Sequence, residues 1–178
     1  MIFLIAAFPG IDACHGIDDF RRLCLYPPGC RWQSRSVERF HLTLAELHID
    51  ESRLPQVQAI LEGLRMPLSD CLIRIPKKAG PVHELKVRVP PAFRRFRDQM
   101  HAELTEAGFQ VLGGKRPHLT LSYHFVAHTP GATMRDIAWV VDGLRLVWSQ
   151  REPEFPRAKH VIRGEYPAVE PAQARLFA

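Results

Sequence analysis

The sequence has no long apolar run. The longest, residues 2–8, is far shorter than the roughly 20 residues that a membrane-spanning helix requires. No Lys or Arg precedes this run, and Pro9 and Gly10 close it, so it does not have the pattern of a secretory signal. These two absences predict a cytoplasmic protein that does not enter a membrane.

Cysteine pairs and a strong excess of one charge are also missing. The cysteines at positions 14, 24, 30 and 71 form no C-x-x-C pair and have no histidine at zinc-ligand spacing, so we expect free thiols and no metal site. The 24 Lys and Arg against 19 Asp and Glu give a formal charge of only +5, and the cations are scattered. A polyanionic partner is therefore compatible with the sequence but is not required by it.

The residues that are present are sufficient for one globular domain. Hydrophobic types make up 46% of the 178 residues, and no shift in composition marks a linker. We therefore expect a single domain over residues 1–178. The apolar spacing predicts strands over residues 2–8, 36–49, 71–75, 83–89, 117–125, 137–148 and 159–164, and helices over 17–25, 53–64 and 92–107. This order predicts an α+β fold.

The most informative pattern is a tetrapeptide that occurs twice. His-Leu-Thr-Leu begins at His41 and again at His118, each time on a predicted strand, and an Arg stands two residues before each histidine. Since side chains alternate along a strand, His and Thr point to one face while both leucines point to the other. The leucines would fill the core, and two imidazoles and two hydroxyls would converge across a shared groove.

This set of groups suits the cleavage of a phosphodiester. With an ordinary pKa of about 6.5, one imidazole can act as a neutral base while the other acts as a protonated acid. In-line displacement needs both roles, and Thr hydroxyls and nearby cations can bind the phosphate oxygens. The alternative is two unrelated strands whose histidines are exposed or serve packing, as we expect for the histidines at positions 15, 48, 83, 101 and 160. The repetition of both His and Thr in opposite halves of the chain favours the cleavage of a phosphodiester.

The paired motifs resemble those of the two-histidine phosphoesterase superfamily. Over most of its length, to about Tyr166, the chain most resembles the bacterial RNA 2′,3′-cyclic phosphodiesterase branch, also called the 2′-5′ RNA ligase family. The resemblance implies two pseudo-symmetric lobes, each an antiparallel sheet backed by helices, around a central cleft. It also implies opening of 2′,3′-cyclic phosphate ends of RNA to a 2′-phosphate without metal or cofactor, with weak 2′-5′ RNA ligation in some members.

The resemblance also implies roles for individual residues. It makes His41 the proton donor and His118 the proton acceptor, and it makes Thr43 and Thr120 phosphate-binding residues. Many members have an Arg two residues after the second motif, where this chain has Tyr123. We therefore expect the phosphate cation to come from one of three other residues, Arg39, Lys115 or Arg116.

Aromatic residues near the motifs suggest a place for a nucleobase. Trp32 lies in a polar stretch before the first motif, and Tyr123 follows the second, so we expect both to offer stacking faces. The expected partners are RNA ends or small cyclic nucleotides, bound by a monomer. Two alternatives stay open: a phosphodiesterase for a small cyclic nucleotide derivative, and a non-catalytic module that binds nucleotides or RNA.

Overall fold

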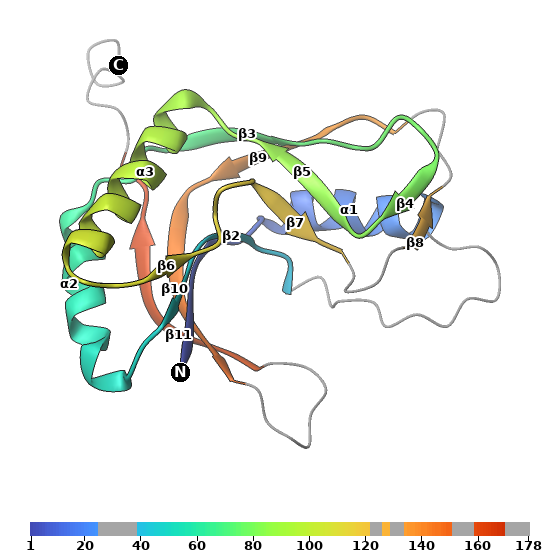
Figure 1. The fold of residues 1–178 in the computed structure, drawn as a ribbon. Helices are drawn as coiled ribbons and strands as arrows, with labels where there is room; N and C mark the ends of the chain where they lie inside the picture. Colours follow the sequence, from blue (N-terminus) through green and yellow to red (C-terminus); the bar gives the residue numbers. More distant parts are fainter. Residues whose placement is uncertain (25–38, 122–125, 129–133, 151–158, 170–178) are drawn as a thin grey trace, which may run out of the picture.

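A computed structural model describes residues 1–24, 39–121, 126–128, 134–150 and 159–169 (Figure 1). Cys30, Trp32 and Tyr123 lie outside these ranges. The helices are α1 (Ile11–Cys24), α2 (Leu54–Gly63), which follows a 3-10 turn at Glu51–Arg53, and α3 (Pro91–Glu106). The strands are β1 (Ile2–Ala7), β2 (Leu42–His48), β3 (Ser69–Ile73), β4 (Gly80–Val82), β5 (Glu84–Arg88), β6 (Val111–Leu112), β7 (His118–Thr120), β8 (Val126–His128), β9 (Ile137–Val141), β10 (Gly143–Gln150) and β11 (Lys159–Pro167).

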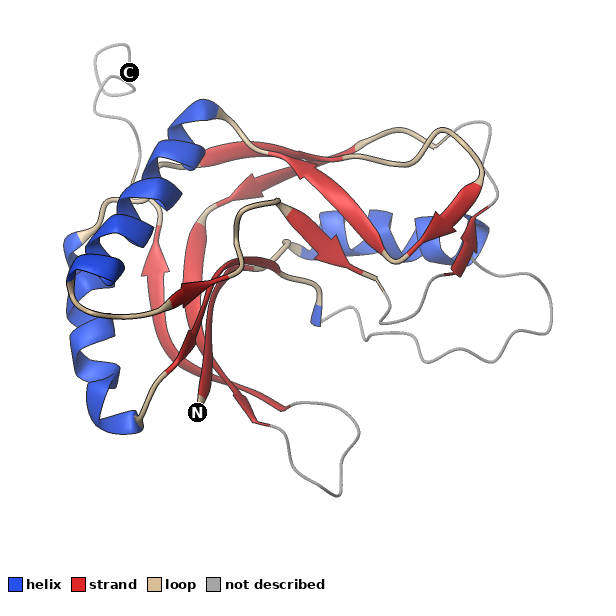
Figure 2. Cartoon of the chain, in the orientation of Figure 1, coloured by secondary structure: helices blue, strands red, loops and turns tan. Residues whose placement is uncertain are grey.

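The strands form one long, curled sheet with two halves. Its order is β11-β10-β1-β2-β7-β5-β3-β9, with β6 beside β2, and each pairing between these strands is antiparallel. Figure 2 shows the two halves turning about the β2–β7 contact, while β4 and β8 pair separately. We call β11-β10-β1-β2-β6 the first lobe and β7-β5-β3-β9 the second. The expected α+β fold with two antiparallel lobes is confirmed.

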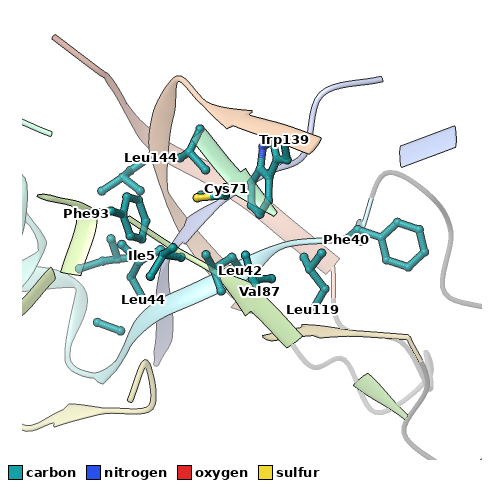
Figure 3. Packing of buried hydrophobic residues seen from close by; sticks show 14 of the residues in the cluster. Ile5, Phe40, Leu42, Leu44, Cys71, Val87, Phe93, Leu119, Trp139 and Leu144 are labelled. Atoms are coloured by element: carbon teal, nitrogen blue, oxygen red, sulfur yellow. The ribbon is translucent and has the colours of Figure 1, made fainter. Parts of the chain in front are cut away.

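The two lobes meet at a row of leucines. Leu42 of β2 lies opposite Leu119 of β7, and Leu119 lies opposite Leu85 of β5. All three side chains belong to the buried hydrophobic cluster, in which Figure 3 labels Leu42 and Leu119. A slip of one residue would turn these leucines toward solvent and the polar side chains of the motifs into the core, so burial fixes the register.

Helices α1 and α3 are exchanged between the lobes, whereas α2 stays with the first. Helix α1 follows β1 of the first lobe but contacts β9 of the second. Helix α3 follows β5 of the second lobe but contacts α2 and β6, and α2 also contacts β11 of the first. The apolar stripe predicted for α3 is buried, as expected: Phe93, Phe96, Met100 and Leu104. Because each half of the chain covers the other lobe, the lobes share one core.

Two predicted elements differ from the structure. The strand expected over residues 137–148 is two strands, since β9 pairs with β3 and β10 pairs with β1, and the chain passes between lobes at the exposed Asp142. Apolar alternation continues across this point, so periodicity alone does not reveal the change of partner. Helix α1 begins at Ile11 instead of residue 17, because Ala13 and Cys14 extend its buried face.

Three cysteines of the described residues, Cys14, Cys24 and Cys71, are buried thiols that are not in a disulfide, as the sequence predicts. Burial raises the pKa of the Cys71 thiol to about 12, and the nearby Asp70 carboxylate adds to the shift. Burial also raises the pKa of Cys14. Both thiols therefore stay protonated at neutral pH. No helix among the described residues is long and apolar enough to cross a membrane.

Candidate active site

The two tetrapeptides lie side by side on one face of the sheet. Leu42 is opposite Leu119, so the antiparallel register places Thr43 beside His118 and His41, just before β2, beside Thr120. All four side chains point away from the leucines because side chains alternate along a strand. His41 and His118 are therefore diagonal neighbours, which lie about 7–8 Å apart in paired strands and within reach of each other's side chains.

Both imidazole rings are held in the same way by the backbone. Nδ1 of His41 lies 2.9 Å from the carbonyl oxygen of Arg39, and Nδ1 of His118 lies 2.8 Å from the carbonyl oxygen of Arg116. A carbonyl only accepts hydrogen bonds, so each Nδ1 carries a hydrogen and donates it. In both rings Nε2 is therefore the atom that can take up or release a proton at the site.

The surroundings of the two rings differ. His41 is only 7% exposed, with the Phe8 ring centroid at 5.6 Å and the His160 ring edge-on at 5.3 Å. The His118 side chain is 39% exposed, and its Nε2 lies 3.7 Å from Oε2 of Glu84. The first ring is thus enclosed by aromatic groups, whereas the second lies beside a carboxylate.

Strand β5 adds two charged residues to the same face. Glu84 is opposite Thr120, and Lys86 is opposite His118. Both also line a groove of about 350 Å³ beside the histidines, together with Arg74, Ile75, Pro76, Pro81, Val82 and His83. Since Glu84 and Lys86 belong to the motif face and to the groove, the two are continuous.

The two cations that line the groove, Arg74 and Lys86, differ in their ion pairing. Arg74 is paired with Asp136, with 3.1 Å between Nη1 and Oδ2. Lys86 is exposed and forms no ion pair with the other residues that the structure describes. Lys86 is therefore a cation that can meet an anionic ligand without first breaking such an ion pair.

The structure brings together four of the residues predicted from the sequence: His41, Thr43, His118 and Thr120. Arg39 is half-buried, and Arg116 is exposed. Each of these residues contacts a motif histidine through its backbone carbonyl oxygen. Lys115 is also exposed. Trp32 and Tyr123 lie outside the described residues.

Sequence reasoning missed Glu84, Lys86 and the position of His160. The alternation in residues 83–89 already indicates that Glu84 and Lys86 share a polar face of their strand. The alternation does not reveal that this strand pairs with the strand of the second motif. Two histidines that we expected to be surface or packing residues lie near the site. His83 lines the groove, and His160 packs against His41.

Solved structures resemble this protein in fold. No protein-family model and no curated protein matches the sequence. The structure of LigT from E. coli in complex with NADP+ superposes with a TM-score of 0.68 at 13% identity, covering 93% of this chain and 96% of LigT. The chain shares the LigT fold.

Two further structures with the LigT fold superpose equally well. A phosphoesterase gives a TM-score of 0.69 at 15% identity over 93% of this chain and 97% of its own. The protein TT0787 of Thermus thermophilus gives 0.67 at 18% identity over 94% and 97%. The fold that the motif resemblance implies is therefore confirmed.

Proposed function

We propose that this protein is a metal-independent phosphodiesterase that opens a 2′,3′-cyclic phosphate to a 2′-phosphate, at an RNA end or on a small cyclic nucleotide. The observation that carries the proposal is the matched pair of His-x-Thr motifs. Each imidazole is oriented by a backbone carbonyl, and both Nε2 atoms belong to one face of paired strands. Two such groups can supply the base and the acid of an in-line displacement.

The histidines and threonines of the two motifs, together with Lys86, each have a use in this reaction. One Nε2 removes a proton from the attacking water, and the other donates a proton to the leaving ribose oxygen. The hydroxyls of Thr43 and Thr120 donate hydrogen bonds to the non-bridging phosphate oxygens. The ammonium of Lys86, opposite His118, stabilises the negative charge that builds on the phosphate in the transition state.

The groove beside the histidines suits the organic part of a nucleotide. Its lining combines apolar side chains, among them Ile75 and Val82, with the cation of Lys86. Nucleotides are also the ligands of structures with this fold, since LigT has been crystallised with 3′-AMP and with NADP+. A ribose and base over the groove would leave the cyclic phosphate between His41 and His118.

The test is turnover in EDTA of a short RNA ending in a 2′,3′-cyclic phosphate and of a cyclic mononucleotide. We expect activity in the chelator and a loss of about 10²- to 10⁴-fold in His41→Ala and in His118→Ala. The control is His48→Ala, an exposed histidine at the end of β2 that pairs with Glu46. Full activity in either motif variant, or abolition by the chelator, contradicts the proposal.

The same assay separates the alternative functions. A long RNA contact neutralises many phosphates, so its affinity falls steeply between low and physiological salt. A single cyclic phosphate loses little affinity over that range. If the protein binds nucleotides but turns over none of them, it is a binding module, and the proposed activity is wrong.

A further inference from the structure

We propose that the open face of the second lobe binds the RNA strand that leads to the cyclic phosphate, and that Arg88 and Arg116 hold phosphates of the nucleotides upstream of the reacting end. The inference rests on the proposed function and deepens it, because it selects an RNA end over a small cyclic nucleotide as the substrate. It is carried by three cations, Lys86 and these two arginines, at neighbouring positions of two paired strands beside His118.

The positions of the two arginines follow from the pairing of β5 with β7, which lie side by side in Figure 1. Beyond the register position of His118, the N–H of Val87 donates to the carbonyl oxygen of Pro117 at 2.9 Å, so the pairing continues by one residue. Arg88 comes next on β5 and lies on the face of the motif histidines, since side chains alternate along a strand. Arg116 comes two residues before His118 on the neighbouring strand, a step of about 6–7 Å.

Both arginines are available to an anionic ligand. Each side chain is exposed, and neither forms an ion pair with another residue of the ranges that the structure describes. The nearest acidic groups of this face have other partners. Asp136 pairs with Arg74, and Glu84, at the opposite end of β5, has an oxygen 3.7 Å from Nε2 of His118.

The part of the face beyond the arginines is open and largely apolar. Leu72 of β3 is opposite Arg88, and Ala138 of β9 is opposite Leu72. Leu72 is half-buried and Ala138 is exposed, and Val140 on the same face of β9 is 51% exposed. Asp70 is opposite Val140, one step farther from the site than Leu72. Cations that precede exposed apolar surface suit a single RNA strand, because the charged backbone and the flat bases then each have a partner.

The same face of the first lobe has a different charge arrangement. Arg145 is in the register row of Ala6 and Thr43, and its Nε donates to Oε1 of Glu165 at 2.8 Å. This ion pair adds no net charge, whereas the three cations of the second lobe are not in such pairs with the described residues. A polyanion is therefore attracted more strongly to the second lobe.

The groove and the arginines lie on opposite sides of Lys86 along β5. The groove is lined by His83, Glu84 and Lys86, and Arg88 lies two residues beyond Lys86. A terminal nucleoside in the groove, with its cyclic phosphate at the motif histidines, continues through its 5′ oxygen toward the arginines. The upstream phosphates then meet Arg88 and Arg116, and Lys86 stays with the reacting phosphate.

Substrates that differ in length test this surface by turnover. We would measure kcat/KM in EDTA on a 2′,3′-cyclic mononucleotide and on a pentaribonucleotide that ends in a 2′,3′-cyclic phosphate. The wild type should prefer the pentaribonucleotide. Arg88→Gln should lower kcat/KM on the pentaribonucleotide by about 2- to 5-fold, the usual effect of losing an exposed ion pair, and leave the mononucleotide unchanged. In Arg116→Gln the ratio of the two values should fall by a similar factor.

Binding gives a readout that needs no turnover. The probe is a fluorescent pentaribonucleotide with a 3′-phosphate, and its anisotropy is followed over a range of NaCl concentrations. Each substitution to Gln should reduce the slope of log affinity against log salt by about 0.7, the value for one phosphate contact of a single strand. Arg88→Lys keeps the charge and should keep the slope. The matched control is Arg65→Gln, which removes an exposed cation between α2 and β3, outside this face, and should change neither readout.

The outcomes separate this inference from the proposed function. If Arg88→Gln binds the pentaribonucleotide with the affinity and salt slope of the wild type, the surface is overturned while the proposed activity stands. If Arg88→Gln loses equally on the mononucleotide and the pentaribonucleotide, Arg88 acts at the reacting phosphate and the surface is again overturned. If the wild type turns over neither substrate, the proposed function itself fails.

Discussion

The two copies of the tetrapeptide have the same local structure and different neighbours. In each copy the leucines are buried, and Nδ1 of the histidine contacts the carbonyl oxygen of the residue two positions earlier. The neighbours come from different strands. The first copy lies between β7 and β1, where Ala6 is opposite Thr43, whereas the second lies between β2 and β5, where Lys86 is opposite His118.

This difference shows how a repeated motif can carry two complementary roles. The motif with its backbone contact orients each ring through Nδ1. The surrounding elements then decide whether that ring has an enclosed aromatic setting or a carboxylate. Because acid and base must differ in charge at the same pH, identical surroundings would serve the reaction poorly.

The largest expected effect comes from the contact between the first copy and the turn that precedes the second. Gly114 has a φ of +71°, and a Cβ there would lie 1.8 Å from the carbonyl oxygen of Leu44, the last residue of the first copy. Gly114→Ala should therefore destabilise the fold by about 4 kcal/mol or more, as substitutions that force the backbone to move do. Urea unfolding measures the loss.

The neighbouring glycine is the matched control for this contact. Gly113 has a φ of +73° and open space around its Cβ position, so Gly113→Ala should cost only about 1–2 kcal/mol, the cost of a left-handed residue with a side chain. Equal losses in the two variants would contradict the close approach of Gly114 to the first copy at Leu44.

We expect a smaller effect from substitutions of the two motif threonines. If both hydroxyls donate to a charged phosphate, Thr43→Val and Thr120→Val should each lower kcat/KM by about 10- to 100-fold. The control Thr105→Val changes an exposed helical threonine whose hydroxyl donates to the carbonyl oxygen of His101. A loss in one motif variant alone would mean that one copy holds the phosphate and the other supplies only its histidine.

The smallest effect tests the core that both copies share. The Cys71 thiol ionises near pH 9 in the unfolded chain but near 12 in the fold, so the folded state binds more protons between these values. Stability should therefore fall as the pH rises above 9. At pH 10 the wild type should have lost about 1 kcal/mol relative to pH 8, a loss that is missing in Cys71→Ala. Urea unfolding at both pH values measures it, and identical losses in wild type and variant would contradict a dry core at Cys71.

Much of the fold is predictable because its elements have clear apolar periods. The first strand, helix α2 and helix α3 lie within a residue or two of their predicted bounds. The candidate site is predictable in part for the same reason, since alternation places His41 and Thr43 on one face. The short strands β4, β6 and β8 were not predicted, because two or three residues show no period.

The sequence by itself determined the strands and helices, the buried leucines and the two motifs, because all of these depend on residues close together in the chain. Only the tertiary structure decided that β7 pairs with both β2 and β5, that the helices cross between lobes, and that Glu84 lies beside His118 while His160 lies against His41. The physical reason is that strand pairing depends on how distant segments bury their apolar faces together, and periodicity within one segment carries no record of its partner.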